Sequence, residues 1–123
     1  MLNKSHLISF VATSNAKFAR EFYEKTLGLT FASGDQFVLV FEVNGTMLRI
    51  QKVDKVTPHG YTVLGWEVTD IKKEVSQLIK RGITFARYEG MDQDELGIWK
   101  APSGARIAWS TDPDGNILSL TQF

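Results

Sequence analysis

The chain contains no cysteine, which excludes disulfide bonds, thiolate nucleophiles, zinc ribbons and iron–sulfur clusters. It has only two histidines, His6 and His59, and therefore few imidazole groups for metal binding. The function must rest on other side chains.

Neither sign of charge predominates, because 14 Lys and Arg balance 14 Asp and Glu. No segment concentrates basic residues, so we expect no nucleic-acid partner. The longest clear apolar run, 37–41, is far shorter than the ~20 residues that span a bilayer, and we expect no membrane segment. The N-terminus shows no small-residue cleavage site of a signal peptide, which favours a cytoplasmic location.

Apolar residues, in contrast, are abundant. Hydrophobic residues make up 43% of the chain and aromatic residues 11%, which is too much for a disordered protein. A length of 123 residues leaves room for one domain, or for two small modules that share a core.

The first half follows the order strand, helix, three strands. An apolar stretch at 6–12 predicts a strand, and Asn15 is the expected N-cap of a helix that ends at Gly28. Three further strands are predicted at 29–32, 36–43 and 46–53. Asn44 and Gly45, between the last two, favour a type I′ hairpin turn because both tolerate positive φ.

The second half repeats this order. A strand at 61–68 leads to Asp70 as a cap and to a helix that ends at Gly82. Strands are then predicted at 83–88, 105–111 and 116–122. Residues 27–32 and 81–86 are identical at four of six positions. We therefore interpret the chain as a single domain, 1–123, of two repeated modules at about 1–56 and 60–123.

Two connections in the second half differ in character. Residues 112–115, Asp-Pro-Asp-Gly, predict a turn whose carboxylates accept hydrogen bonds from turn amides, although they are also possible ligands. Residues 89–104 form a long connection of the kind that often serves as a lid or binding loop.

Three motifs carry a resemblance to a known family: Phe22-Tyr23 followed by Leu27-Gly28-Leu29, Asp112 to Asn116, and Ala108-Trp109. With the doubled β-α-β-β-β order, they make the whole chain resemble the vicinal oxygen chelate superfamily, which includes glyoxalase I, bleomycin-resistance proteins, fosfomycin-resistance enzymes and extradiol dioxygenases. The resemblance implies an α+β fold of two tandem modules whose curved mixed sheets surround a cleft, and a homodimer that completes the clefts.

The resemblance also implies four metal-ligand positions, where enzymes of the superfamily carry His, Glu, His or Gln, and Glu. In this sequence those positions correspond to Ile8, Gln51, Val63 and Ser119, with the register of Gln51 open by a residue or two. Two of these side chains have no donor atom and two are weak neutral ligands. We expect no metal or other cofactor. His6, two residues before Ile8, is a weak candidate ligand.

Residues that alternate with these positions are expected to share the same cleft face: Phe10, Arg49, Gly65 and Ile117. Trp66, Trp99 and Trp109 are candidates for aromatic walls, or alternatively pack in a core or dimer interface. Arg49 either points into the cleft, where it needs an anionic partner, or lies exposed on the other face.

These observations leave three functions open. The first is a metal-free, bleomycin-resistance-like protein that binds a small planar or aromatic molecule in a cleft at a dimer interface. The second is an enzyme of the superfamily, a lyase, isomerase or dioxygenase, with a rearranged metal site. The third is an interaction domain whose cleft is filled by its own side chains.

Overall fold

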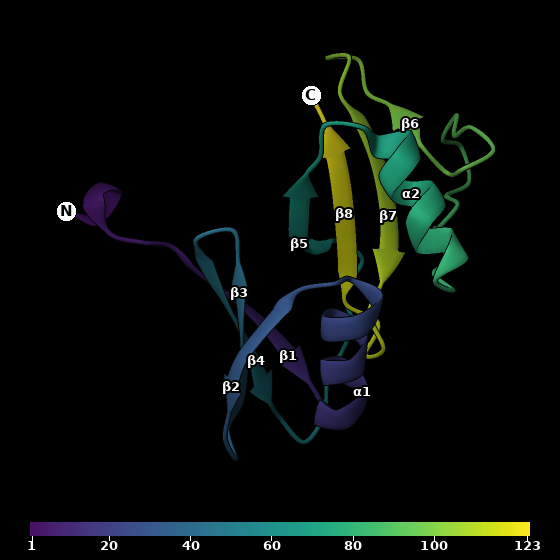
Figure 1. Ribbon diagram of the computed structural model, residues 1–123. Coiled ribbons are helices and arrows are strands. Elements are labelled where there is room, and N and C mark those ends of the chain that lie inside the picture. Colours follow the sequence, from purple (N-terminus) through teal and green to yellow (C-terminus); the bar gives the residue numbers. More distant parts are fainter. The chain divides into compact units, whose positions relative to one another are not determined.

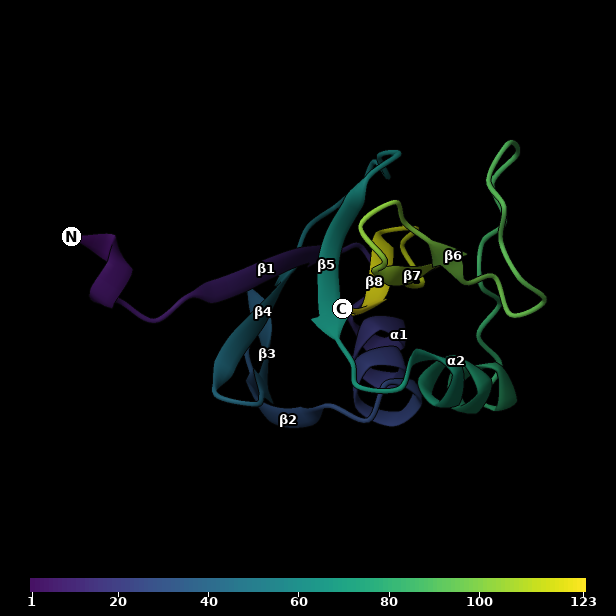
Figure 2. The ribbon, with the colours of Figure 1, turned by 90° about the horizontal axis from the view of Figure 1, so that it is seen from above.

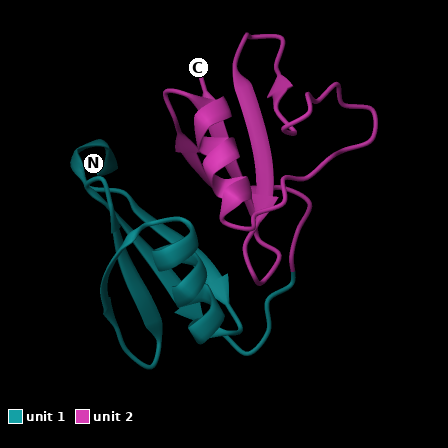
Figure 3. Ribbon diagram, turned by 45° about the vertical axis from the view of Figure 1, so that its right-hand side comes forward, with its two compact units in different colours: residues 1–57 teal, residues 58–123 magenta.

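The computed structural model describes residues 1–123, which form two compact units, 1–57 and 58–123 (Figure 3). Unit 1 contains a 3-10 helix, η1 (Leu2–Lys4), then β1 (Ile8–Thr13), α1 (Ala16–Glu21), a π-helical turn η2 (Phe22–Thr26), β2 (Thr30–Gly34), β3 (Val38–Val43) and β4 (Thr46–Lys52). Unit 2 contains β5 (Thr62–Glu67), α2 (Ile71–Lys80), β6 (Trp99–Lys100), β7 (Arg106–Thr111) and β8 (Ile117–Gln122) (Figure 1).

Each unit has one four-stranded mixed sheet, with the strand orders β1-β4-β3-β2 and β5-β8-β7-β6. The first and last strands of each unit pair in parallel, and the other neighbours pair antiparallel. The crossover from β1 to β4 therefore passes through a helix and a hairpin, as does the crossover from β5 to β8. The predicted α+β fold of two β-α-β-β-β modules is confirmed.

The helix of unit 1 begins where the sequence predicts. The Asn15 side chain accepts a hydrogen bond from the Phe18 amide at 3.2 Å, which satisfies one free N–H of the first turn. The helix does not continue regularly to residue 27, because its last turn is π-helical and Leu27 N–H donates to the Phe22 carbonyl at 2.9 Å. Gly28, with φ of 76°, ends it as expected.

The core of unit 1 lies between α1, η2 and the sheet. Tyr23 and Phe41 are fully buried, with ring centroids 6.1 Å apart, and Phe31 packs edge-on against Phe41 at 5.5 Å. Leu48 and Ile50 of β4 complete this face of the sheet. Burial of such side chains contributes about 1.5–3 kcal/mol each, so this face determines which side of the sheet the helix covers.

The helix of unit 2 is fastened at its N-terminus by two side chains. Asp70 accepts a hydrogen bond from the Lys73 amide at 3.2 Å, and the Gln122 side chain of β8 accepts one from the Ile71 amide at 2.9 Å. Ile71 and Val75 are fully buried on the face that α2 turns towards the sheet. None of the helices in either unit combines the length and the apolar composition needed to span a membrane.

The predicted hairpin between β3 and β4 is confirmed, with Asn44 and Gly45 at φ of 46° and 86° between the paired residues Val43 and Thr46. The predicted strand at 83–88 is wrong. That segment forms a single backbone bond with the sheet, from Ala86 N–H to the Trp109 carbonyl.

The sequence analysis also missed β6, which occupies the edge of β7 next to Ala86. A two-residue strand has no detectable alternation, which explains the omission. Figure 2 shows the long connection before β6 as an extended loop in green, which projects from the rest of unit 2.

The turn at 112–116 is built around a buried carboxylate. Asp112 is 6% exposed, and its Oδ1 accepts hydrogen bonds from the amides of Asp114 and Asn116 at 2.9 and 3.0 Å. Its Oδ2 accepts a third from the Asn116 side-chain amide at 2.9 Å. The carboxylate therefore organises the turn that leads into β8, as the interpretation based on turn amides predicts.

We predict that Asp112→Ala lowers the free energy of unfolding by about 2–4 kcal/mol, because it leaves buried donors without an acceptor. Urea denaturation followed by circular dichroism measures this change. Asp92→Ala, at an exposed position without hydrogen bonds, is the matched control and should change stability by less than about 0.5 kcal/mol. Equal stability of the two variants would contradict this role of Asp112.

Candidate functional site

Each sheet has one face packed against the helix of its own unit and one face opposite that helix. We call the second the far face. In both sheets buried residues alternate with more exposed ones along the strands, as a sheet covered on one side requires. In unit 1 the buried set includes Phe41 and Leu48, so the residues that alternate with them along β3 and β4 lie on the far face. In unit 2 the buried set includes Ala108 and Leu118.

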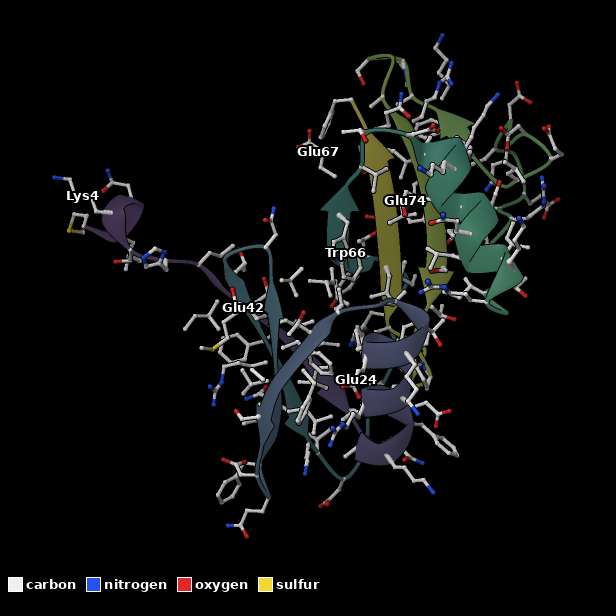
Figure 4. The ribbon with its side chains drawn as sticks, viewed as in Figure 1. Lys4, Glu24, Glu42, Trp66, Glu67 and Glu74 are labelled. Atoms are coloured by element: carbon white, nitrogen blue, oxygen red, sulfur yellow. The ribbon has the colours of Figure 1, made fainter.

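The register of β1, β4 and β3 defines the rows of the far face of unit 1. Ile8 lies opposite Met47, which lies opposite Glu42. The next row contains Phe10, Arg49 and Val40, and the third contains Ala12, Gln51 and Val38. Figure 4 labels Glu42 on this sheet and Glu24 on η2.

This register separates two residues that the resemblance assigns to metal-ligand positions of the superfamily. Gln51 lies opposite Ala12, four residues along the strand from the row of Ile8. At about 3.3 Å per residue this is roughly 13 Å, far more than one ion can bridge. The β4 residue opposite Ile8 is Met47. Gln51 therefore does not lie beside Ile8 in the sheet.

Arg49 lies on the far face, in the same row as Phe10. Its side chain is half-buried, and its Nη1 donates a weak hydrogen bond to the Met47 sulfur at 3.7 Å. It makes no ion pair. Phe10 in the same row is 51% exposed, and Ile8 in the row before is 45% exposed.

The Asp35 carboxylate interacts electrostatically with Arg49, but its hydrogen bonds are with backbone amides. The amides of Phe37 and Val38 donate to its Oδ1 at 2.8 and 3.0 Å, and these bonds are the main cause of its lowered pKa. The charges of Lys52 and Arg49 lower the pKa further, by less. Asp35 thus holds the turn before β3 and stays ionised at neutral pH.

The far face of unit 2 carries an aromatic cluster. Trp109 lies in contact with Trp99 of β6, with ring centroids 6.1 Å apart, and with Tyr88 of the preceding loop at 5.6 Å in an edge-to-face arrangement. Trp99 is placed by its pairing with Ile107, two residues before Trp109 on β7. The sequence analysis missed Tyr88. The only signal in the sequence was that Tyr88 ends the wrongly predicted strand at 83–88 and directly precedes the connection at 89–104.

The same row of this face is nearly flat beside Trp109. Ser119 lies opposite Trp109 on one side and opposite Gly65 on the other. A Cβ atom at position 65 would lie 2.6 Å from the Ser119 hydroxyl oxygen, so only glycine fits without displacing that side chain. The row therefore has small residues beside the aromatic cluster. We call Gly65 and Ser119 the low floor, and Tyr88, Trp99 and Trp109 the aromatic wall.

Two other candidates of unit 2 lie differently. Trp66 pairs with Leu120, which is buried against the helix side of the sheet, so its register places it on the face opposite Trp109. Trp66 therefore does not share the face that carries Trp99 and Trp109. Figure 4 labels Trp66 on β5. Val63, 40% exposed, is the extra residue of a β-bulge between Thr62 and Leu64.

The connection from 89 to 104 forms internal hydrogen bonds. The Gln93 side-chain amide donates to the carbonyls of Ala86 and Gly97, both at 2.9 Å. Asp94 Oδ1 accepts from the amides of Leu96 and Ile98, both at 2.9 Å. These bonds fix the conformation of the segment just before Trp99, which pairs with β7 at the edge of the sheet.

The residues at the superfamily's ligand positions do not fit a divalent metal ion. Ile8 and Val63 have no donor atom, and Gln51 lies far from Ile8 along its strand. His6 is exposed before β1, and the ring of His59 stacks on Tyr61 with centroids 5.3 Å apart. No group of three or more His, Asp or Glu side chains could hold a metal ion.

Solved structures share this fold over the whole chain. A member of the glyoxalase/bleomycin resistance protein/dioxygenase superfamily from Sphaerobacter thermophilus is 24% identical, with a TM-score of 0.77 and 100% of each chain covered. The glyoxalase family protein from Enterococcus faecalis is 20% identical, with a TM-score of 0.72, covering 98% of this chain and 99% of that one. The lactoylglutathione lyase from Agrobacterium tumefaciens is 16% identical, with a TM-score of 0.70, covering 97% and 93%.

These similarities show that the chain has the fold of the glyoxalase/bleomycin resistance protein/dioxygenase superfamily, which confirms the resemblance seen in the sequence. No family model matches the chain, and no curated protein matches it in sequence.

We predict that Ni²⁺, Zn²⁺, Mn²⁺ and Fe²⁺ leave the melting temperature of the protein unchanged, and that EDTA does the same, because Ile8 and Val63 offer no donor. Differential scanning fluorimetry measures both. A metal ion bound stoichiometrically through His6 or a carboxylate would contradict this prediction.

The strand register provides a positive control. Ile8→His with Met47→Glu places two ligands directly opposite each other and should create stabilisation by Ni²⁺. Ile8→His with Gln51→Glu separates the same two ligands and should create none.

Proposed function

We propose that this protein binds a small planar or aromatic molecule without the help of a metal ion, and that it does so as a homodimer. The observation that supports this best is the cluster of Tyr88, Trp99 and Trp109 beside the low floor of Gly65 and Ser119. A flat ring can lie on such a floor and contact the aromatic wall, where offset or edge-to-face packing contributes about 0.5–1.5 kcal/mol beyond area burial.

The side chains favour binding over metal-dependent catalysis. Lyases, isomerases and dioxygenases that rely on a metal need it to stabilise developing negative charge on the substrate. That role requires several strong donors on neighbouring strands, and the resemblance places Ile8 and Val63 at the first and third ligand positions. A rearranged metal site would need donors that the chain does not bring together.

Apolar residues that unit 1 leaves uncovered support the homodimer. Ile8 and Phe10 project from the far face of unit 1, and both are about half exposed. Soluble chains seldom leave neighbouring large apolar side chains uncovered without a partner or ligand. A second copy of the chain, in a symmetric pair, would cover them.

We predict a sedimentation mass of twice 13.8 kDa at micromolar concentration. Phe10→Glu should shift the mass towards that of a single chain, because it places a charge in the proposed interface. Phe37→Glu is the matched control, since Phe37 is 68% exposed just before β3, and it should leave the mass unchanged. A single-chain mass for the unaltered protein would contradict the homodimer.

We predict that planar aromatic compounds quench tryptophan fluorescence and raise the melting temperature. At a ligand concentration 100 times Kd the stabilisation is about 2.7 kcal/mol. Trp109→Leu should weaken binding about tenfold, which corresponds to about 1.4 kcal/mol.

Trp66→Phe is the matched control for Trp109→Leu, because Trp66 lies on the opposite face of the same sheet, and it should keep the affinity of the unaltered protein. Equal losses in the two variants would show that the ligand does not lie against Trp109. The absence of any bound aromatic compound across a broad screen would contradict the proposed function.

A further inference from the structure

Arg49 is placed where its charge has no partner in the chain. It lies in the middle row of the far face of unit 1, between Phe10 on β1 and Val40 on β3. The side chain is half-buried, and its one hydrogen bond goes to the sulfur of Met47, a weak acceptor. Most of the guanidinium N–H donors are therefore left without a protein acceptor.

Neither of the two nearby carboxylates, Glu42 and Asp35, pairs with Arg49. Glu42 lies on the same far face, opposite Met47 in the neighbouring row, and forms no ion pair with Arg49. Asp35 accepts its hydrogen bonds from the backbone of Phe37 and Val38. If the face is covered in a binding site, Arg49 loses water and needs an acceptor, because an unpaired buried cation is costly.

The neighbours of Arg49 indicate the shape of that acceptor. Phe10 and Val40 flank it with apolar surface, which suits a ring, while the planar guanidinium suits a carboxylate bound through two parallel hydrogen bonds. The only other charged strand residue of this face is Glu42, which is negative. Glu42 repels a dianionic phosphate more strongly than a singly charged carboxylate, and a carboxylate needs only the one cation that this face provides.

We propose that the far face of unit 1 is a binding site of its own, for an aromatic carboxylate: Arg49 binds the carboxylate group while Phe10 and Val40 contact the ring. This inference goes beyond the proposed function, which rests on the aromatic cluster of unit 2.

The test uses two probes with the same ring and different charge, 2-naphthoate and 2-naphthamide, measured by isothermal titration calorimetry on the full chain. We expect 2-naphthoate to bind at least tenfold more tightly than 2-naphthamide. Equal affinities, or tighter binding of the amide, would overturn this inference and leave the proposed function standing. Binding of neither probe would overturn this inference as well, whereas the proposed function is contradicted only by the absence of any ligand in the broad screen.

Variants assign the difference to Arg49. Arg49→Met should remove the preference for 2-naphthoate and keep the affinity for 2-naphthamide, while Arg49→Lys should keep part of the preference. Arg20→Met is the matched control, because Arg20 lies on α1 over the ring of Phe31, and it should retain the full preference. A preference that survives Arg49→Met in a protein with an unchanged melting curve would overturn the assignment.

Glu42→Gln provides a test in the opposite direction. It removes the negative charge next to Arg49 and should tighten 2-naphthoate binding two- to fivefold without affecting 2-naphthamide. Weaker binding of 2-naphthoate by this variant would overturn the proposal, because it would show that Glu42 supports the ligand's anion instead of opposing it.

Discussion

The parallel pairing of the first and last strands of each unit is the constraint on which the rest of this structure depends. It joins β1 to β4 and β5 to β8 across long stretches of chain, so a helix must cross one face of each sheet. Because side chains alternate along a strand, burial of one face under the helix assigns every second residue to the far face. Phe10 and Arg49 share one row, and Gly65, Ser119 and Trp109 share another, as a consequence of this pairing.

The two far faces differ in chemistry although the units have the same topology. Unit 1 presents Arg49 among apolar side chains, and unit 2 presents aromatic rings beside a glycine and a serine. Neither offers the donors that a divalent ion requires. The fold therefore matches that of the superfamily, while we propose that the side chains recognise a planar ring and a carboxylate instead of a metal-bound substrate.

Local signals predicted much of the fold correctly. The N-caps Asn15 and Asp70, the Asn44–Gly45 turn and the Asp112 turn were all recognisable, because each depends on hydrogen bonds or φ values within a few residues. The wrong prediction of a strand at 83–88 and the missed strand β6 concern instead which segment pairs with the edge of β7. That competition is decided by contacts distant in sequence, and no local pattern reports it.

The sequence by itself determined the doubled β-α-β-β-β order and the residue types of the candidate site, because periodicity, caps and turns are local properties. Only the tertiary structure decided which of those residues meet. It placed Met47 instead of Gln51 opposite Ile8, and it turned Trp66 away from Trp109 and brought Tyr88 to it. The physical reason is that a shift of one residue between strands exchanges the two faces of a sheet, and the pairing of distant strands sets that shift.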